Sequence, residues 1–221
     1  MVNIRSDSPV LVIGLGRFGS ATAAELDRLD HEVLAIEVHP ARVQAWVDRV
    51  THVVEADATS IEALKQLGAH EFGGAVLAVG DSIESSVLIA ANLVDLGIPR
   101  IWAKAMSVSH GKILERIGVH HVIYPEREAG ERVAHLISGA MLDFIEFDDN
   151  FVIAKLRPPQ SMQGRSLSDA QVRSRYRITV TGVKRPGQHF DYATADTVIE
   201  ERDLIIVSGQ SQDVERFSSL P

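Results

Sequence analysis

A glycine-rich segment near the N-terminus is the strongest chemical signal in the sequence. Gly14, Gly16 and Gly19 have the spacing G-x-G-x-x-G, between a short apolar stretch and a segment with helical periodicity. The first glycine permits a tight turn, the second lets the backbone approach a phosphate, and the third lets the helix pack closely on the strand. Amide groups at the helix N-terminus would then face the anion. The pattern predicts a phosphate-binding turn formed by Gly14, Gly16, Arg17, Phe18 and Gly19.

A carboxylate follows where nucleotide binding requires one. Glu37 ends the second predicted strand, where an acidic side chain accepts hydrogen bonds from ribose hydroxyls and repels a 2′-phosphate. The glycine turn and this acid together predict a bound nucleotide. Arg17, inside the turn, is placed to meet a phosphate from its own or a neighbouring subunit. The alternative for Arg17 is a solvent-facing position on the helix.

Three other charged residues lie at predicted strand ends. Asp57 opens Asp57-Ala58-Thr59 after the third strand, and it is either a turn or helix-capping residue or a ligand beside the adenine pocket. Lys104 ends the fifth strand and Glu126 follows the sixth, so both would open onto the crevice where such sheets bind ligands. For both, an ordinary solvated charge is the alternative.

Catalytic motifs are scarce. The sequence has no G-x-x-x-x-G-K-[ST] phosphate loop, no G-x-S-x-G elbow and no H-E-x-x-H pair. His120 and His121 are adjacent, which on a strand points them to opposite faces, so we interpret them as structural. Ser82, Ser85 and Ser86 suit helix capping. We therefore expect a binding protein and not an enzyme.

The elements that position these residues alternate between short apolar strands and amphipathic helices. This alternation predicts an α/β fold, a Rossmann-like doubly wound parallel sheet. Six strands are expected, at Val10–Gly14, Glu32–Glu37, His52–Asp57, Ala75–Gly80, Arg100–Ala105 and His121–Pro125. Helices are expected at Arg17–Leu29, Pro40–Arg49, Ile61–Leu67, Ile83–Leu96, Ser109–Ile117 and Glu128–Met141.

The periodicity changes after Met141 and predicts a second, small α+β domain. Strands are expected at Leu142–Phe147, Phe151–Leu156, Ile178–Lys184 and Leu204–Ser208, and helices at Ser166–Val172 and Gln212–Leu220. We place the domain limits at residues 1–141 and 142–221.

The composition of the chain indicates which partners and which cellular compartment to expect. The 221 residues include no cysteine and carry a net charge of −8, which disfavours nucleic acid and anionic lipid as partners. The first residues lack the apolar stretch of a signal peptide, and no apolar run reaches the roughly 18 residues of a membrane-spanning helix. We expect a cytoplasmic protein that reaches a membrane only through a partner.

Several longer motifs resemble the RCK proteins, the regulators of potassium conductance. They are GLGRFG, HEVLAIE, the Asp57-Ala58-Thr59 triplet, AVG at Ala78 to Gly80, IPRIWAKA, LERIGVHHVIYPE and IEERDLIIVSGQ. The resemblance covers nearly the whole chain and is closest to the cytosolic subunits of Ktr and Trk potassium uptake systems. It implies an RCK N-terminal and C-terminal domain, a homodimer built through the helix after the sixth strand, and an octameric ring of dimers. The ring would dock on a membrane potassium-translocating subunit.

The resemblance also implies ligands and roles by position. ATP and ADP would compete for the cleft, with the glycines on the phosphates, Glu37 on the ribose, Asp57 and Ala58 near adenine, and Ala78 and Lys104 completing the cleft. Arg17 would reach the γ-phosphate across the dimer. Glu126 would help to hold a divalent cation, Mg²⁺ or Ca²⁺, beside it.

Some relatives bind cyclic di-AMP in the C-terminal domain through two aliphatic residues and an arginine. Asp169 and Arg173 fit that pattern, but Leu167-Ser168 replaces the expected aliphatic pair, so this ligand stays open.

Two other functions remain compatible with the residues. An NAD-dependent oxidoreductase would use the same glycine turn and Glu37, although no proton-transfer residue is evident. An NAD(H)- or nucleotide-responsive module could instead serve another cation or antiporter system.

Overall fold

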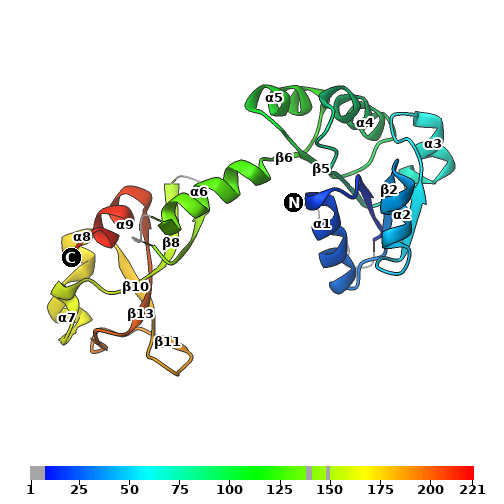
Figure 1. Cartoon of the computed structure of the whole chain (residues 1–221). Coiled ribbons are helices and arrows are strands. Elements are labelled where there is room, and N and C mark those ends of the chain that lie inside the picture. The colour runs from blue at the N-terminus through cyan, green and yellow to red at the C-terminus, as the bar shows by residue number, and fades with distance from the viewer. Residues whose placement is uncertain (1–7, 138–140, 148–149) are drawn as a thin grey trace. The chain divides into compact units, whose positions relative to one another are not determined.

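The computed structural model describes residues 8–137, 141–147 and 150–221. The chain forms two compact units, Met1–Pro125 and Glu126–Pro221 (Figure 1).

The first unit is built on a parallel sheet. Its six strands are β1 (Val10–Ile13), β2 (Val33–Glu37), β3 (His52–Glu55), β4 (Gly74–Leu77), β5 (Ile101–Lys104) and β6 (His121–Ile123). They lie in the order β3-β2-β1-β4-β5-β6, and every neighbouring pair is parallel. The strand order reverses direction between β1 and β4, which is where doubly wound sheets bind ligands. The predicted Rossmann-like sheet is confirmed.

Helices cover both faces of this sheet. They are α1 (Arg17–Arg28), α2 (Pro40–Trp46), α3 (Ile61–Gln66), α4 (Ile83–Asp95) and α5 (Val108–Ile117), with a short 3₁₀ turn η1 (Ala69–Glu71). Val10 and Val12 of β1 pack in one apolar cluster with Ala23 of α1. Leu11 and Ile13 face the other way, in a cluster that takes its helical residues from α3, α4 and α5. Strands β1, β2 and β4 are therefore buried at every residue.

The helix ends follow local sequence signals. Pro40 begins α2, and Gly118 ends α5 in the left-handed region with φ of 110°. Ser82 caps α4 by accepting a hydrogen bond from the backbone amide of Ser85. Pro40 and Gly118 stand where the sequence predicts a helix start and stop, and Ser82 acts as the expected cap.

The second unit contains an antiparallel sheet in the order β11-β10-β13-β8-β7. Its strands are β7 (Asp143–Phe147), β8 (Phe151–Leu156), β10 (Thr179–Lys184), β11 (Phe190–Tyr192) and β13 (Leu204–Gln210). Strands β9 (Arg165–Ser166) and β12 (Val198–Ile199) form a separate two-stranded ladder. The helical segments are α6 (Pro125–Ile137), η3 (Gln160–Met162), α7 (Leu167–Ala170), α8 (Val172–Tyr176) and α9 (Ser211–Ser218).

Two details of the second unit differ from the sequence prediction. The single helix expected at Ser166–Val172 is two short helices, because Gln171 adopts a left-handed conformation with φ of 50°. The short strands β9, β11 and β12 were not predicted, since two- and three-residue strands carry too little alternation to recognise.

Helix α6 contacts strand β7 of the second unit. Arg132 forms an ion pair with Asp143 at 2.6 Å, and the His135 ring lies edge-on to Phe144 with 4.8 Å between ring centroids. The limit expected at Met141 falls after this helix, whereas the compact units divide at its first turn.

Candidate functional site

The glycine turn joins β1 to α1 and depends on two close backbone approaches. Gly14 has φ of +91°, a conformation that side chains disfavour. A Cβ on Gly19 would overlap the carbonyl oxygen of Gly14 and lie 2.8 Å from the Cβ of Ala78. Gly14 is therefore needed for its backbone conformation and Gly19 for helix packing, as the motif predicts.

The middle glycine has a different environment. Gly16 is the N-terminal cap of α1, with φ of −68° that any residue can adopt, and a Cβ there would meet nothing within 4 Å. The space beside Gly16 is therefore open at the start of a twelve-residue helix, where backbone amides and the helix dipole favour an anion.

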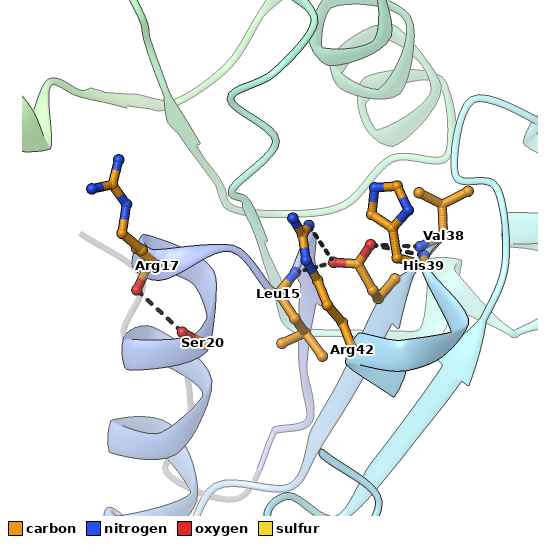
Figure 2. A network of polar contacts seen from close by, with 7 residues as sticks. Leu15, Arg17, Ser20, Val38, His39 and Arg42 are labelled. Atoms are coloured by element: carbon orange, nitrogen blue, oxygen red, sulfur yellow. Dashed lines mark hydrogen bonds and ion pairs between the residues drawn. The ribbon is translucent and has the colours of Figure 1, made fainter. Parts of the chain in front are cut away.

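The Glu37 carboxylate is buried beside this turn and bound by protein donors. It is 3% exposed. Oε2 accepts a hydrogen bond from the Leu15 amide at 2.8 Å and forms an ion pair with the Arg42 guanidinium at 3.4 Å. Oε1 accepts the amides of Val38 and His39 at 2.9 and 3.0 Å (Figure 2). The acid thus links the glycine turn to the loop between β2 and α2.

The charge of Glu37 is stabilised in place. Burial raises the pKa of Glu37. The hydrogen bonds from the His39 and Leu15 amides and the charge of Arg42 together lower it by more than burial raises it, so the pKa lies below its ordinary value. Glu37 is consequently ionised at neutral pH, the state in which a carboxylate accepts from ribose hydroxyls.

Asp57 and Ala58 form the turn after β3. The Oδ1 atom of Asp57 accepts from the backbone amide and the hydroxyl of Thr59, at 2.9 and 2.7 Å. These hydrogen bonds lower the pKa of Asp57. The Nδ2 of Asn92 on α4 donates to the backbone carbonyls of Ala58 and Thr59. Asp57 therefore has the turn role that the sequence offered as one interpretation, and its adenine role stays a prediction.

Ala78 directly follows β4, and Lys104 is the last residue of the neighbouring strand β5. Ala78 is buried and its amide donates to the Ile13 carbonyl at 2.8 Å, which fixes the backbone next to Gly14. A Cβ on Gly80 would lie 3.2 Å from Nζ of Lys104, so the ammonium group lies beside the loop after β4. Both residues are at the carboxyl edge of the sheet, with the glycine turn.

Arg17 and Phe18 point in different directions from the turn. Arg17 is exposed, and Figure 2 shows its side chain extending away from the Glu37 network. Phe18 is partly buried and packs on the apolar cluster of Val10 and Val12. Its side chain therefore serves packing.

Glu126 lies in the first turn of α6, exposed, and belongs to the second unit, whereas Arg17 belongs to the first. Among the residues that the structure describes, no three His, Asp or Glu side chains gather as a metal site. The role of Glu126 beside a divalent cation stays a prediction.

The second unit contains a hollow of about 340 Å³. Leu167, Ser168 and Arg173 line it, and Arg173 donates through Nε and a terminal nitrogen to the Thr179 hydroxyl. The Asp169 carboxylate instead accepts from the Ser166 hydroxyl at 2.7 Å, and Ser166 caps α7 by accepting from the Asp169 amide at 3.1 Å. The other lining residues are mostly apolar or small: Val172, Ile178, Thr179, Val180, Ala193, Thr194 and Ala195.

Arg42 makes a contact with Glu37 that the sequence did not indicate. It lies in the first turn of α2, and its guanidinium reaches the carboxylate of Glu37 across the intervening loop. The available signal was a cation shortly after the strand-ending acid, but such a residue is most often solvated.

Two family models match the chain, TrkA-N domain over residues 10–125 and TrkA-C domain over residues 151–220. The chain belongs to the RCK family. This RCK protein is 35% identical over 209 residues to Ktr system potassium uptake protein A of Bacillus subtilis, with 94% of each chain covered. It is 32% identical to Ktr system potassium uptake protein C of the same organism, covering 93% of this chain and 94% of the relative.

Solved structures give the same fold. The chain matches the GsuK RCK domain with a TM-score of 0.67 and 16% identity, covering 100% of this chain and 50% of that one. It matches the GsuK channel bound to NAD with a TM-score of 0.70 and 17% identity, covering 100% and 41%. The RCK protein therefore spans about half or less of those chains. None of its described helices is long and apolar enough to cross a membrane.

Proposed function

We propose that this RCK protein binds ATP and ADP at the glycine turn and regulates a membrane potassium-translocating subunit. The observation that carries the proposal is the pairing of open space at Gly16 with the ionised Glu37 at one strand-reversal point. The first would receive phosphates and the second a ribose. The relatives named as Ktr potassium uptake proteins support the transport role.

The protein would act by binding and not by turnover. An octameric ring of homodimers, in the cytoplasm and held at the membrane through its partner, would couple nucleotide state to the gate. A ligand shifts such an assembly only by binding one conformation more tightly than the other. ATP and ADP differ by one phosphoryl group, so the residues near the γ-phosphate must supply the difference.

Arg17 is the residue that we propose for this discrimination. It stands at the first position of α1, exposed and directed away from the Glu37 network, so it is free to meet the γ-phosphate of a nucleotide in a neighbouring subunit. Glu126 would hold Mg²⁺ or Ca²⁺ beside that phosphate. The cation would neutralise phosphate charge, and Glu126 would orient it with a single carboxylate.

Replacing Arg17 tests this role directly. Arg17→Ala should lower the affinity for ATP about tenfold and leave ADP nearly unchanged, because only ATP has the γ-phosphate that the guanidinium contacts. Isothermal titration with both nucleotides gives the ratio, and Arg28→Ala on the same helix is a matched control because Arg28 pairs with Glu25. An unchanged ratio of ATP to ADP affinity would contradict the role of Arg17.

Thermal stabilisation tests the binding itself. ATP, ADP, NAD and NADH, each with and without magnesium, should raise the melting temperature in the order of their affinities at equal concentration, with the largest shift from the tightest ligand. We expect the largest shift with an adenine nucleotide. Absence of a shift with ATP and ADP would contradict the proposal.

NAD(H) is the second candidate ligand. Glu37 suits an NAD ribose equally well, and the GsuK channel, which shares this fold, has been solved bound to NAD and bound to ADP. A larger thermal shift with NADH than with ATP would favour a redox-responsive regulator, and hydride transfer over a substrate panel would identify an oxidoreductase.

In this proposal the hollow of the second unit is the candidate site for cyclic di-AMP. Arg173 lines it and would face a phosphate, but Ser168 replaces an aliphatic residue that would stack on a base. Titration of cyclic di-AMP against Arg173→Ala decides whether that ligand binds.

A further inference from the structure

The Glu37 carboxylate has no acceptor position left for a ligand. An ionised carboxylate offers about four lone-pair sites. Four donors already occupy them: the amides of Leu15, Val38 and His39, and the guanidinium of Arg42. A ribose hydroxyl can therefore donate to Glu37 only if one of these donors leaves.

The four donors are not equally replaceable. The three amides lie 2.8 to 3.0 Å from the carboxylate and are held by the turn after β1 and the loop after β2. Moving any of them would disturb the backbone of the site. Arg42 is a side-chain donor at 3.4 Å, the longest of the four distances, and its side chain is 48% exposed. Because the Arg42 side chain is half-exposed and its contact is the longest, Arg42 can leave Glu37 for solvent without any movement of the backbone.

We propose that Arg42 occupies the ribose subsite of the nucleotide-free protein and is exchanged for a ribose hydroxyl when a nucleotide binds. Arg42 is then a specificity-determining residue, because it sets how much the ribose hydroxyls contribute to the affinity for a nucleotide. This inference rests on the proposed nucleotide binding and adds that the Arg42 side chain competes with the ribose for Glu37. Figure 2 shows Arg42 reaching Glu37 from α2, on the side of the carboxylate opposite Val38 and His39.

The exchange has a measurable consequence. A nucleotide with both ribose hydroxyls must break the Glu37–Arg42 ion pair before it forms its hydrogen bond to Glu37. Loss of the ion pair therefore offsets part of the binding free energy that the hydrogen bond contributes. A nucleotide without the hydroxyls leaves the ion pair intact. Arg42 should consequently reduce the preference of the site for ATP over 2′,3′-dideoxy-ATP, while both ligands keep the same base and phosphates.

Arg42→Ala tests the exchange by the ratio of two dissociation constants. In the full-length protein, the affinity for ATP relative to 2′,3′-dideoxy-ATP should rise about two- to fivefold in the variant, which corresponds to an ion pair of up to about 1 kcal/mol. Arg42→Met, which keeps the apolar part of the side chain, should raise the ratio equally. Arg28→Ala removes one exposed cation elsewhere and should leave the ratio unchanged.

Other outcomes separate this inference from the proposed function. An unchanged or lower ratio in both Arg42 variants would overturn the exchange while leaving nucleotide binding intact. A similar loss of affinity for both ligands would also overturn it, because Arg42 would then hold the nucleotide itself. If the wild-type protein bound neither ATP nor ADP, the proposed function would fail together with the inference. Melting temperatures without ligand confirm that each variant is folded.

Discussion

The two sheets of this protein bury their strands in different ways. In the parallel sheet, consecutive residues of β1, β2 and β4 are all buried, because helices lie on both faces. In the antiparallel sheet, the burial of β8 and β13 alternates residue by residue, so one face is packed and the other is partly exposed.

The difference explains where chemistry can be found in each unit. A sheet covered on both faces leaves polar groups only at its strand ends, so Glu37, Asp57 and Lys104 are concentrated near one edge. A sheet covered on one face offers polar positions along its whole length. A charged residue in the second unit is therefore a much weaker indication of a binding site than a charged residue at a strand end of the first unit.

The largest expected effect on stability comes from disturbing the close packing of the glycine turn. Gly19→Ala should lower the free energy of unfolding of the first unit by about 3 kcal/mol, because the added Cβ overlaps the Gly14 carbonyl. Gly16→Ala is the matched control and should cost about 1 kcal/mol or less, since its Cβ enters open space. Denaturant unfolding followed by tryptophan fluorescence measures both, because Trp46 and Trp102 are in the first unit.

Gly16→Ala should at the same time weaken nucleotide binding, since the methyl group takes the space expected for a phosphate. Equal destabilisation by the two substitutions would contradict the separate roles of these glycines.

Neighbouring core positions test the two burial patterns. In β1, Leu11→Ala and Val12→Ala should each cost about 2 to 4 kcal/mol, because both residues are fully buried on opposite faces. In the second sheet, Leu156→Ala should cost about 3 kcal/mol, whereas Ile145→Ala should cost less than about 1 kcal/mol because Ile145 is 61% exposed. Far-UV circular dichroism during guanidinium unfolding gives these values. A large cost at Ile145 would show that a partner covers the second face.

The smallest expected effect concerns a buried histidine of the first unit. His110 is 1% exposed, its Nδ1 accepts from the Met106 amide, and its Nε2 has no partner among the described residues. Burial lowers the pKa of His110 below its ordinary value.

The sign of the pH effect follows from that shift. Below the unfolded pKa of about 6.5, the unfolded chain binds a proton that the folded chain resists, so the free energy of unfolding falls as the pH drops. Between pH 6.5 and 5.5 we expect the wild type to lose up to about 1 kcal/mol more than His110→Gln. Parallel pH dependence of the two proteins would contradict a neutral His110.

Much of the fold was predictable because each signal was local. The glycine spacing predicted the backbone conformation of Gly14 and the packing of Gly19, and Pro40 and Gly118 marked a helix start and a helix end. The doubly wound parallel sheet was predicted from the alternation of strands and helices. The short strands β9, β11 and β12 were not predicted, because two or three residues show too little alternation, and β9 and β12 also pair across a long stretch of sequence.

The site was predictable only in part. The position of Glu37 at a strand end was predicted and its ribose role stays a prediction, but the sequence could not show that four protein donors fill its acceptor sites. The contact of Arg42 depends on how α2 returns to the sheet, and the burial of His110 depends on α5 packing in the core cluster that also contains α3 and α4.

The sequence by itself determined the doubly wound sheet, the conformation of the glycine turn and the position of the acid beside it, because glycine conformations and apolar periodicity act over a few residues. Only the tertiary structure decided which donors surround Glu37, which glycine has open space and that α6 pairs with β7. These depend on elements far apart in the chain, and the free energy of burial and hydrogen bonding that fixes them exists only after those elements have packed.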